Sequence, residues 1–150
     1  PPLREEADRQ AVLQGVLDGT LDCIVTDHAP HTKEEKRDFF TAPNGVIGME
    51  TSFAASYTYL VKTGLMTLSQ LIEKMSLNPA KLLGIEAGSL SVGAPADLAL
   101  IDLKEDWIVD PAKSHSRSCN CIYKGKTLTG KVKYTFLNGK KVYDDKLDKK

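Results

Sequence analysis

A single helix-then-strand step limits what the beginning of this chain can fold into. Residues 4–18 carry apolar side chains along one helical stripe, with acidic residues near the start, where the helix dipole favours negative charge. Asp18-Gly19-Thr20 ends this predicted helix, and the apolar run 21–25 then predicts a short buried strand. Such a step is one unit of a parallel α/β barrel. A barrel of this kind needs eight strands, so one unit cannot close it.

Directly after the expected strand comes the run Thr26-Asp27-His28-Ala29-Pro30-His31. Side chains at the carboxyl end of a barrel strand point into a cleft, so this cluster of one Asp and two His indicates chemistry. For Asp27 two interpretations stay open: it caps a turn, or it is a metal ligand or general base. His28 points the opposite way in an extended backbone, and we interpret it as structural. His31 is expected to share the cleft with Asp27 and to act as a cation or hydrogen-bond donor for an anionic substrate.

The segment that follows, from Thr32 to Ile47, is predicted to be a long loop. Its charged first half is interpreted as a solvated surface, whereas Ala42-Pro43-Asn44-Gly45 forms a turn in which the glycine permits a close approach of backbone to a ligand. A loop of this length beyond a strand end is more often functional than decorative. We therefore expect it to border the site.

Charge and composition exclude several classes of partner. The chain has 20 basic and 20 acidic residues and a formal net charge of zero, so nothing indicates nucleic acid or an anionic membrane as a partner. No apolar run reaches about 18 residues and no signal-peptide pattern opens the chain, which predicts a cytoplasmic protein. The three cysteines argue against a disulfide framework, and Cys119-x-Cys121 lacks a second pair at zinc-site spacing.

The rest of the chain predicts helices first and strands afterwards. Three helices are predicted, at residues 50–62, 67–75 and 78–84. The second begins with a capping box at Thr67, and the third has a proline at its first position. Strands are expected at 96–102 and on both sides of Asn138-Gly139, which is a strong hairpin signal. The lysine-rich end, residues 146–150, is expected to be disordered.

The run 26–31 stands within a wider set of motifs. Pro1-Pro2-Leu3-Arg4 precedes it, and Ala42-Pro43-Asn44-Gly45-Val46-Ile47-Gly48-Met49-Glu50-Thr51 follows it. Together these residues resemble the carboxy-terminal part of a dihydroorotase of the long bacterial-type class, in the amidohydrolase superfamily. The resemblance continues through Ser76–Ala80 and Gly93–Leu98 and covers almost the whole chain.

This resemblance implies an α/β fold in two regions. Residues 1–87 would be the last units of a metal-dependent (β/α)8 TIM barrel, together with an active-site loop. Residues 88–150 would be the carboxyl half of a small accessory β-sandwich. Residues 114–123 depart from the family pattern, because Asn120-Cys121-Ile122-Tyr123 stands where the family usually has Asn, then Pro and an aromatic residue.

The resemblance also implies an activity, the zinc-dependent reversible cyclisation of N-carbamoyl-L-aspartate to dihydroorotate in de novo pyrimidine biosynthesis. Asp27 would bind zinc and shuttle a proton, and His31 would bind the carboxylate of the substrate. Asn44 and Gly45 would contact the pyrimidine ring, through backbone groups because the family more often has an aromatic residue at the position of Asn44. One or two zinc ions are implied, with most ligands outside these residues. A catalytic zinc usually needs about three protein ligands, so this segment alone should be inactive.

Three interpretations of the whole protein stay open. It is an active dihydroorotase, whose partners are its small-molecule substrate and the remainder of the enzyme chain, or a non-catalytic dihydroorotase-like scaffold subunit. The third is another cyclic-amide hydrolase, such as an allantoinase or a dihydropyrimidinase. Asp27 and His31 together disfavour the scaffold, and the His28-Ala29-Pro30-His31 context disfavours the third. The sequence does not fix the oligomeric state, and a homodimer is one option. For the fold we predict that Asp27 and His31 face one cleft and that His28 does not.

Overall fold

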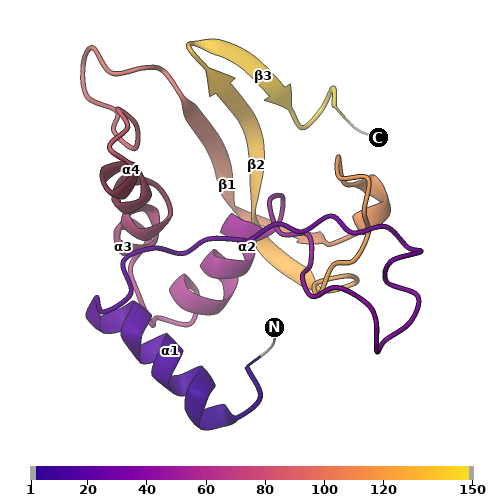
Figure 1. Cartoon of the computed structure of the whole chain (residues 1–150). Coiled ribbons are helices and arrows are strands. Elements are labelled where there is room, and N and C mark those ends of the chain that lie inside the picture. The colour runs from indigo at the N-terminus through magenta and orange to yellow at the C-terminus, as the bar shows by residue number, and fades with distance from the viewer. Residues whose placement is uncertain (1–2, 149–150) are drawn as a thin grey trace.

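The computed structural model describes residues 3–148 as a set of helices beside an antiparallel sheet, crossed by one long irregular segment (Figure 1). The α-helices are α1 (Glu6–Asp18), α2 (Ser52–Ser56), α3 (Leu68–Ile72) and α4 (Asn78–Leu83). The strands are β1 (Leu98–Ile108), β2 (Thr127–Leu137) and β3 (Lys140–Asp144). Single turns of π-helix continue α2 over Tyr57–Val61 and α3 over Glu73–Leu77, and a 3-10 turn covers Pro111–Lys113.

The predicted helices are confirmed. Helix α1 ends at Gly19, whose φ of 90° is left-handed and suits a residue without Cβ. Thr67 forms the predicted capping box with Gln70 at the start of α3. The second and third predicted helices form one continuous helical segment, because the π turn links α3 to α4, and Gly84 ends it at a φ of 65°.

The predicted buried strand at residues 21–25 is wrong. This segment is extended but unpaired, and Val25 is 75% exposed. Its backbone is bound by a helix instead: Lys74 Nζ donates to the Leu21 carbonyl oxygen at 2.7 Å, and the Ile24 amide donates to the Lys74 carbonyl oxygen at 3.0 Å. A parallel strand needs strands on either side, and within residues 3–148 none lies beside it.

The small core lies between α2 and the sheet. Its buried members are Ala54, Ala55, Val109 and Leu128. Phe53 and Tyr57 stack at 5.7 Å beside it and lie against Gly130, where an added Cβ would be 3.1 Å from the Phe53 ring. The helix therefore approaches the sheet closely because β2 carries no side chain at this point.

The strands form one antiparallel sheet in the order β1-β2-β3. Asn138 and Gly139 join β2 to β3 with φ values of 48° and 73°, the two positive values that a type I′ turn requires, and this hairpin prediction is confirmed. The expected disorder after β3 is wrong up to Asp148, because its amide donates to the Asp144 carbonyl oxygen at 2.8 Å; residues 149 and 150 lie outside the described part. No helix among residues 3–148 is both long enough and apolar enough to cross a membrane.

Four charged groups join the end of the chain to one face of the sheet. Lys131 and Lys133 each contact both Glu105 and Asp145, and the contacts to Asp145 measure 2.8 and 2.5 Å. Burial raises the pKa of Asp145, but hydrogen bonds from the two ammonium groups outweigh burial, so the pKa lies below its usual value. Hydrogen bonds to Asp145 likewise raise the pKa of both lysines.

The Asp145→Asn substitution should lower the free energy of unfolding at pH 7 by about 1–2 kcal/mol, because it leaves two half-buried lysines with one carboxylate. A carboxylate with a depressed pKa stabilises the fold above its unfolded pKa of about 3.9, and this contribution disappears as the pH falls through the folded pKa. Urea unfolding at pH 7 and pH 3 should therefore show the difference from the unmodified protein shrinking at pH 3. An unchanged difference would contradict this expectation, and Glu34→Gln, at an exposed carboxylate, is the control.

Candidate active site

The run 26–31 lies on the long segment between α1 and α2, which crosses the molecule and lies beside the loop preceding β2 (Figure 1). Asp27 is exposed and has a φ of 44°. Only Asp27 and Asn138 have a positive φ among the described residues other than glycine. Asp and Asn tolerate this left-handed region better than other residues with a side chain. The backbone therefore turns sharply at Asp27, directly before the two histidines.

His28 has a structural role, as predicted. Its Nδ1 atom accepts hydrogen bonds from the Gly48 amide at 3.1 Å and from the Met49 amide at 3.4 Å. A ring nitrogen that accepts carries no proton, so the proton of the neutral imidazole is on Nε2. His28 therefore fixes the segment that leads into α2.

His31 is bound within its own loop. Its Nε2 atom is 3.1 Å from the carbonyl oxygen of Asn44, to which it can donate, and its Nδ1 atom is 3.7 Å from a carboxylate oxygen of Glu35. Thr32 and Glu35 hold this carboxylate in place, because the Thr32 amide donates to Glu35 Oε2 at 2.7 Å and the Glu35 amide donates to Thr32 Oγ1 at 3.2 Å. The backbone hydrogen bond from Thr32 is the main cause that lowers the pKa of Glu35. The structure thus brings His31, Asn44 and Gly45 together.

Gly45 packs directly against the run 26–31. Its φ is 114°, and an added Cβ would lie 2.5 Å from the Cβ of Ala29 and 3.7 Å from His31 Nε2. The Ala29 amide donates to the Val46 carbonyl oxygen at 2.9 Å, so the two backbones are hydrogen-bonded side by side. Only glycine fits here, for reasons of both space and backbone conformation.

Two residues in the region 88–150, which sequence analysis did not single out as site residues, bind the backbones of residues 29–31 and 45. Ser118 Oγ donates to the His31 carbonyl oxygen at 2.6 Å, and Asn120 Nδ2 donates to the carbonyl oxygens of Ala29 and Gly45 at 3.3 and 2.9 Å. Both lie in the segment 114–123, where the sequence departs from the family pattern. The only signal there was the Asn120 itself, which the family shares.

Two cavities can be compared with the predicted site residues. The larger, of about 640 Å³, lies between the start of α2 and the sheet and is lined by His28, Glu50 and Trp107, among others, but not by Asp27 or His31. The hydrogen bonds of His28 to the amides of residues 48 and 49 carry its ring to the wall of this cavity. That His28 stays outside a cleft shared by Asp27 and His31 remains a prediction. A common cleft for Asp27 and His31 stays a prediction.

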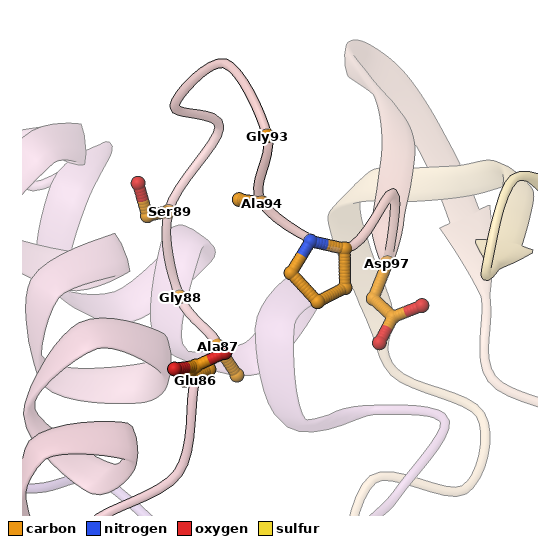
Figure 2. A pocket seen from close by; sticks show the side chains of 8 residues that line it. Glu86, Ala87, Gly88, Ser89, Gly93, Ala94 and Asp97 are labelled. Atoms are coloured by element: carbon orange, nitrogen blue, oxygen red, sulfur yellow. The ribbon is translucent and has the colours of Figure 1, made fainter.

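The smaller cavity, of about 250 Å³, belongs to the connection between α4 and β1. It lies where residues 86–89 and 93–97 pass each other, as Figure 2 shows, and it is lined by Glu86, Asp97, Pro95 and small residues. None of the predicted site residues contributes to it.

The side chains of the described residues do not complete a metal site. In the part of the chain that the structure describes, no three His, Cys, Asp or Glu side chains lie close enough together to hold an ion. Asp27 is the only metal ligand predicted from the sequence, and one carboxylate is not enough to hold a catalytic zinc ion. His115 is exposed, and its Nδ1 atom is 3.5 Å from a carboxylate oxygen of Glu50.

The fold and the run 26–31 can now be assigned to a protein family. The amidohydrolase family model matches residues 2–142, and the chain belongs to this family. Its similar relatives are dihydroorotases. The dihydroorotase of Acetivibrio thermocellus is 49% identical over 148 residues, which is 98% of this chain and 35% of the relative. That of Bacillus caldolyticus is 46% identical over 145 residues, 96% of this chain and 34% of the relative. The chain therefore spans about a third of these relatives.

Solved structures agree on the fold. The D-hydantoinase (dihydropyrimidinase) from Thermus sp. superposes with a TM-score of 0.86 at 26% identity, over 97% of this chain and 33% of that one. The L-hydantoinase (dihydropyrimidinase) from Arthrobacter aurescens gives a TM-score of 0.84 at 33% identity, over 96% and 33% of the two chains. The α/β segment described here is thus part of an amidohydrolase fold.

Proposed function

We propose that this chain is the carboxy-terminal third of a dihydroorotase. The observation that carries the proposal is the identity of nearly half of all residues to dihydroorotases over almost the whole chain. The hydantoinases resemble it in fold at about 26–33% identity, which favours dihydroorotase over dihydropyrimidinase. The full-length protein would interconvert N-carbamoyl-L-aspartate and dihydroorotate in pyrimidine biosynthesis, in the cytoplasm.

Within this proposal the two regions keep their predicted identities. Residues 1–87 would supply the last units of a (β/α)8 barrel, and residues 88–150 would supply half of a β-sandwich. The exposure of Val25 supports the first of these two assignments, because a barrel strand needs neighbours that a longer chain would provide.

Each site residue has a proposed task. Asp27 would contribute one ligand to zinc, and the other ligands would come from the rest of the protein. When bound, zinc polarises a carbonyl group and activates water. The Asp27 carboxylate would hold the proton that passes to the ring nitrogen when the cyclic amide opens. His31 would donate a hydrogen bond to the carboxylate of the substrate in place of its contact with the Asn44 carbonyl oxygen or with Glu35. The backbone at Asn44 and Gly45 would contact the pyrimidine ring.

The substrate carboxylate provides a test of the proposed function. We expect the full-length protein to hydrolyse dihydroorotate with a kcat/KM about 10³-fold or more above that for dihydrouracil, which is the same ring without the carboxylate. A site built around a charged group leaves His31 without its partner when the analogue binds. Steady-state kinetics with both compounds makes the comparison. Comparable turnover of the two would favour a dihydropyrimidinase instead, and no turnover of either would favour a non-catalytic scaffold.

A further inference from the structure

We propose that Ser118 and Asn120 are positioning residues of the active site. They hold the backbone of residues 29–31 and that of residues 44–47 at a fixed separation, so that both segments can bind substrate together. This inference rests on the proposed function, because it takes these segments as the substrate-binding ones. Neither side chain is assigned a contact with a reacting atom; both act through the backbone that they hold.

Asn120 bridges the two segments with one side chain. Its amide nitrogen has two N–H groups, and the carbonyl oxygens of Ala29 and Gly45 lie at 3.3 and 2.9 Å. The backbone carbonyl oxygen of Asn120 also accepts from the Ile47 amide at 3.1 Å. An amide side chain is the group that can donate two parallel hydrogen bonds at this position, whereas a carboxylate only accepts.

Ser118 fixes the end of the first segment and orients Asn120. The residue is 5% exposed, and its hydroxyl group lies 2.6 Å from the carbonyl oxygen of His31 and also contacts Oδ1 of Asn120. The carbonyl oxygens of Ala29 and Gly45 can only accept, so they assign the amide nitrogen of Asn120 to their side and leave its Oδ1 facing Ser118. A buried carbonyl oxygen that loses its donor costs free energy, so both residues favour the same loop geometry.

Ser118 and Asn120 together form a clamp on the two segments, and this clamp determines which backbone groups remain free to bind a ligand. The Gly45 carbonyl oxygen also accepts from Lys36 Nζ at 2.9 Å, so two donors fix the direction of this peptide group. In a trans peptide the carbonyl and the following N–H point in opposite directions. Because the Gly45 carbonyl points to Asn120 and Lys36, the Val46 N–H points away from them. The clamp thereby presents a backbone donor on the face of the loop opposite to Asn120.

The test compares variants of the full-length enzyme with dihydroorotate as substrate. Asn120→Asp keeps the size of the side chain but replaces two donors by an acceptor that faces two carbonyl oxygens. We expect the KM to rise roughly tenfold or more and the kcat to change much less, because the lost interaction binds substrate and transition state alike. Ser118→Ala should shift the KM in the same direction by a smaller factor. Ser69→Ala, at an exposed serine on α3, is the matched control and should leave the KM unchanged.

Amide hydrogen exchange gives a second readout that needs no activity. In Asn120→Asp the Ile47 and Ala29 amides should exchange faster, and in Ser69→Ala they should not. If the unmodified enzyme turns over dihydroorotate but Asn120→Asp and Ser118→Ala leave KM and exchange unchanged, the inference is overturned and the proposed function stands. If the unmodified enzyme is inactive on dihydroorotate, the proposed function fails, and unchanged exchange would overturn the clamp as well. Should Asn120→Asp fail to fold, the milder Ser118→Ala decides by the same two measurements.

Discussion

Replacing Asp27 with asparagine should lower the kcat of the full-length enzyme for dihydroorotate by roughly 10³-fold. General acid–base catalysis contributes on the order of 10²–10⁴-fold to rates, and an amide cannot accept the proton that the carboxylate is proposed to hold. Steady-state kinetics and zinc content should be measured on one preparation. A kcat within about tenfold of the unmodified value would contradict the proposed role.

The backbone at Asp27 makes asparagine the appropriate substitution. With a φ of 44° the residue is left-handed, a conformation that Asn adopts as readily as Asp. Alanine would add backbone strain of about 1–3 kcal/mol, so a loss of activity in Asp27→Ala would mix chemistry with conformation. Asp22→Asn, at an exposed carboxylate in the same segment, is the matched control. It should retain full activity.

Replacing Gly45 with alanine should destabilise the protein by about 2–4 kcal/mol, by adding the strain of a positive φ to a steric clash. The added Cβ would lie 2.5 Å from the Cβ of Ala29, a separation that side chains do not tolerate. The loop must move to relieve the clash, and the KM should rise as well. Thermal unfolding and steady-state kinetics measure the two effects.

Two further variants separate strain from clash. Gly93 has a similar positive φ of 89°, but an added Cβ would meet nothing within 4 Å, so Gly93→Ala reports the strain alone. Combining Gly45→Ala with Ala29→Gly removes the clashing methyl group and should recover part of the stability. Equal losses in Gly45→Ala and Gly93→Ala would show that the close approach at Ala29 has no energetic effect.

The fold was predictable where local chemistry determines it. The turn at Asn138-Gly139, the cap at Thr67 and the helix end at Gly84 each depend on residues close in sequence. The strand at 21–25 was wrong because a parallel strand depends on neighbours that a single run of residues does not contain. Its apolar character remains visible as the exposed Val25.

The site was predictable only in part, for a related reason. Asp27 and His31 were recognised because reactive side chains stand close together in a family motif. Asn120 and Ser118 act on backbone carbonyl oxygens, and a backbone acceptor has no sequence signature that could pair with theirs. The segment 114–123 departs from the family pattern at Cys121 and Ile122, whereas the hydrogen bonds come from Ser118 and Asn120 beside them.

The hydrogen bonds of Ser118 and Asn120 also bear on the order of folding. They join residues 87 and 91 positions apart, and contacts across such distances require a large loop to close before they contribute any stability. Helix α1 and the β2-β3 hairpin are local and can form early. The segments 29–31 and 44–47 can reach their final arrangement only after the region before β2 has docked, so the proposed competence to bind substrate should be acquired late in folding.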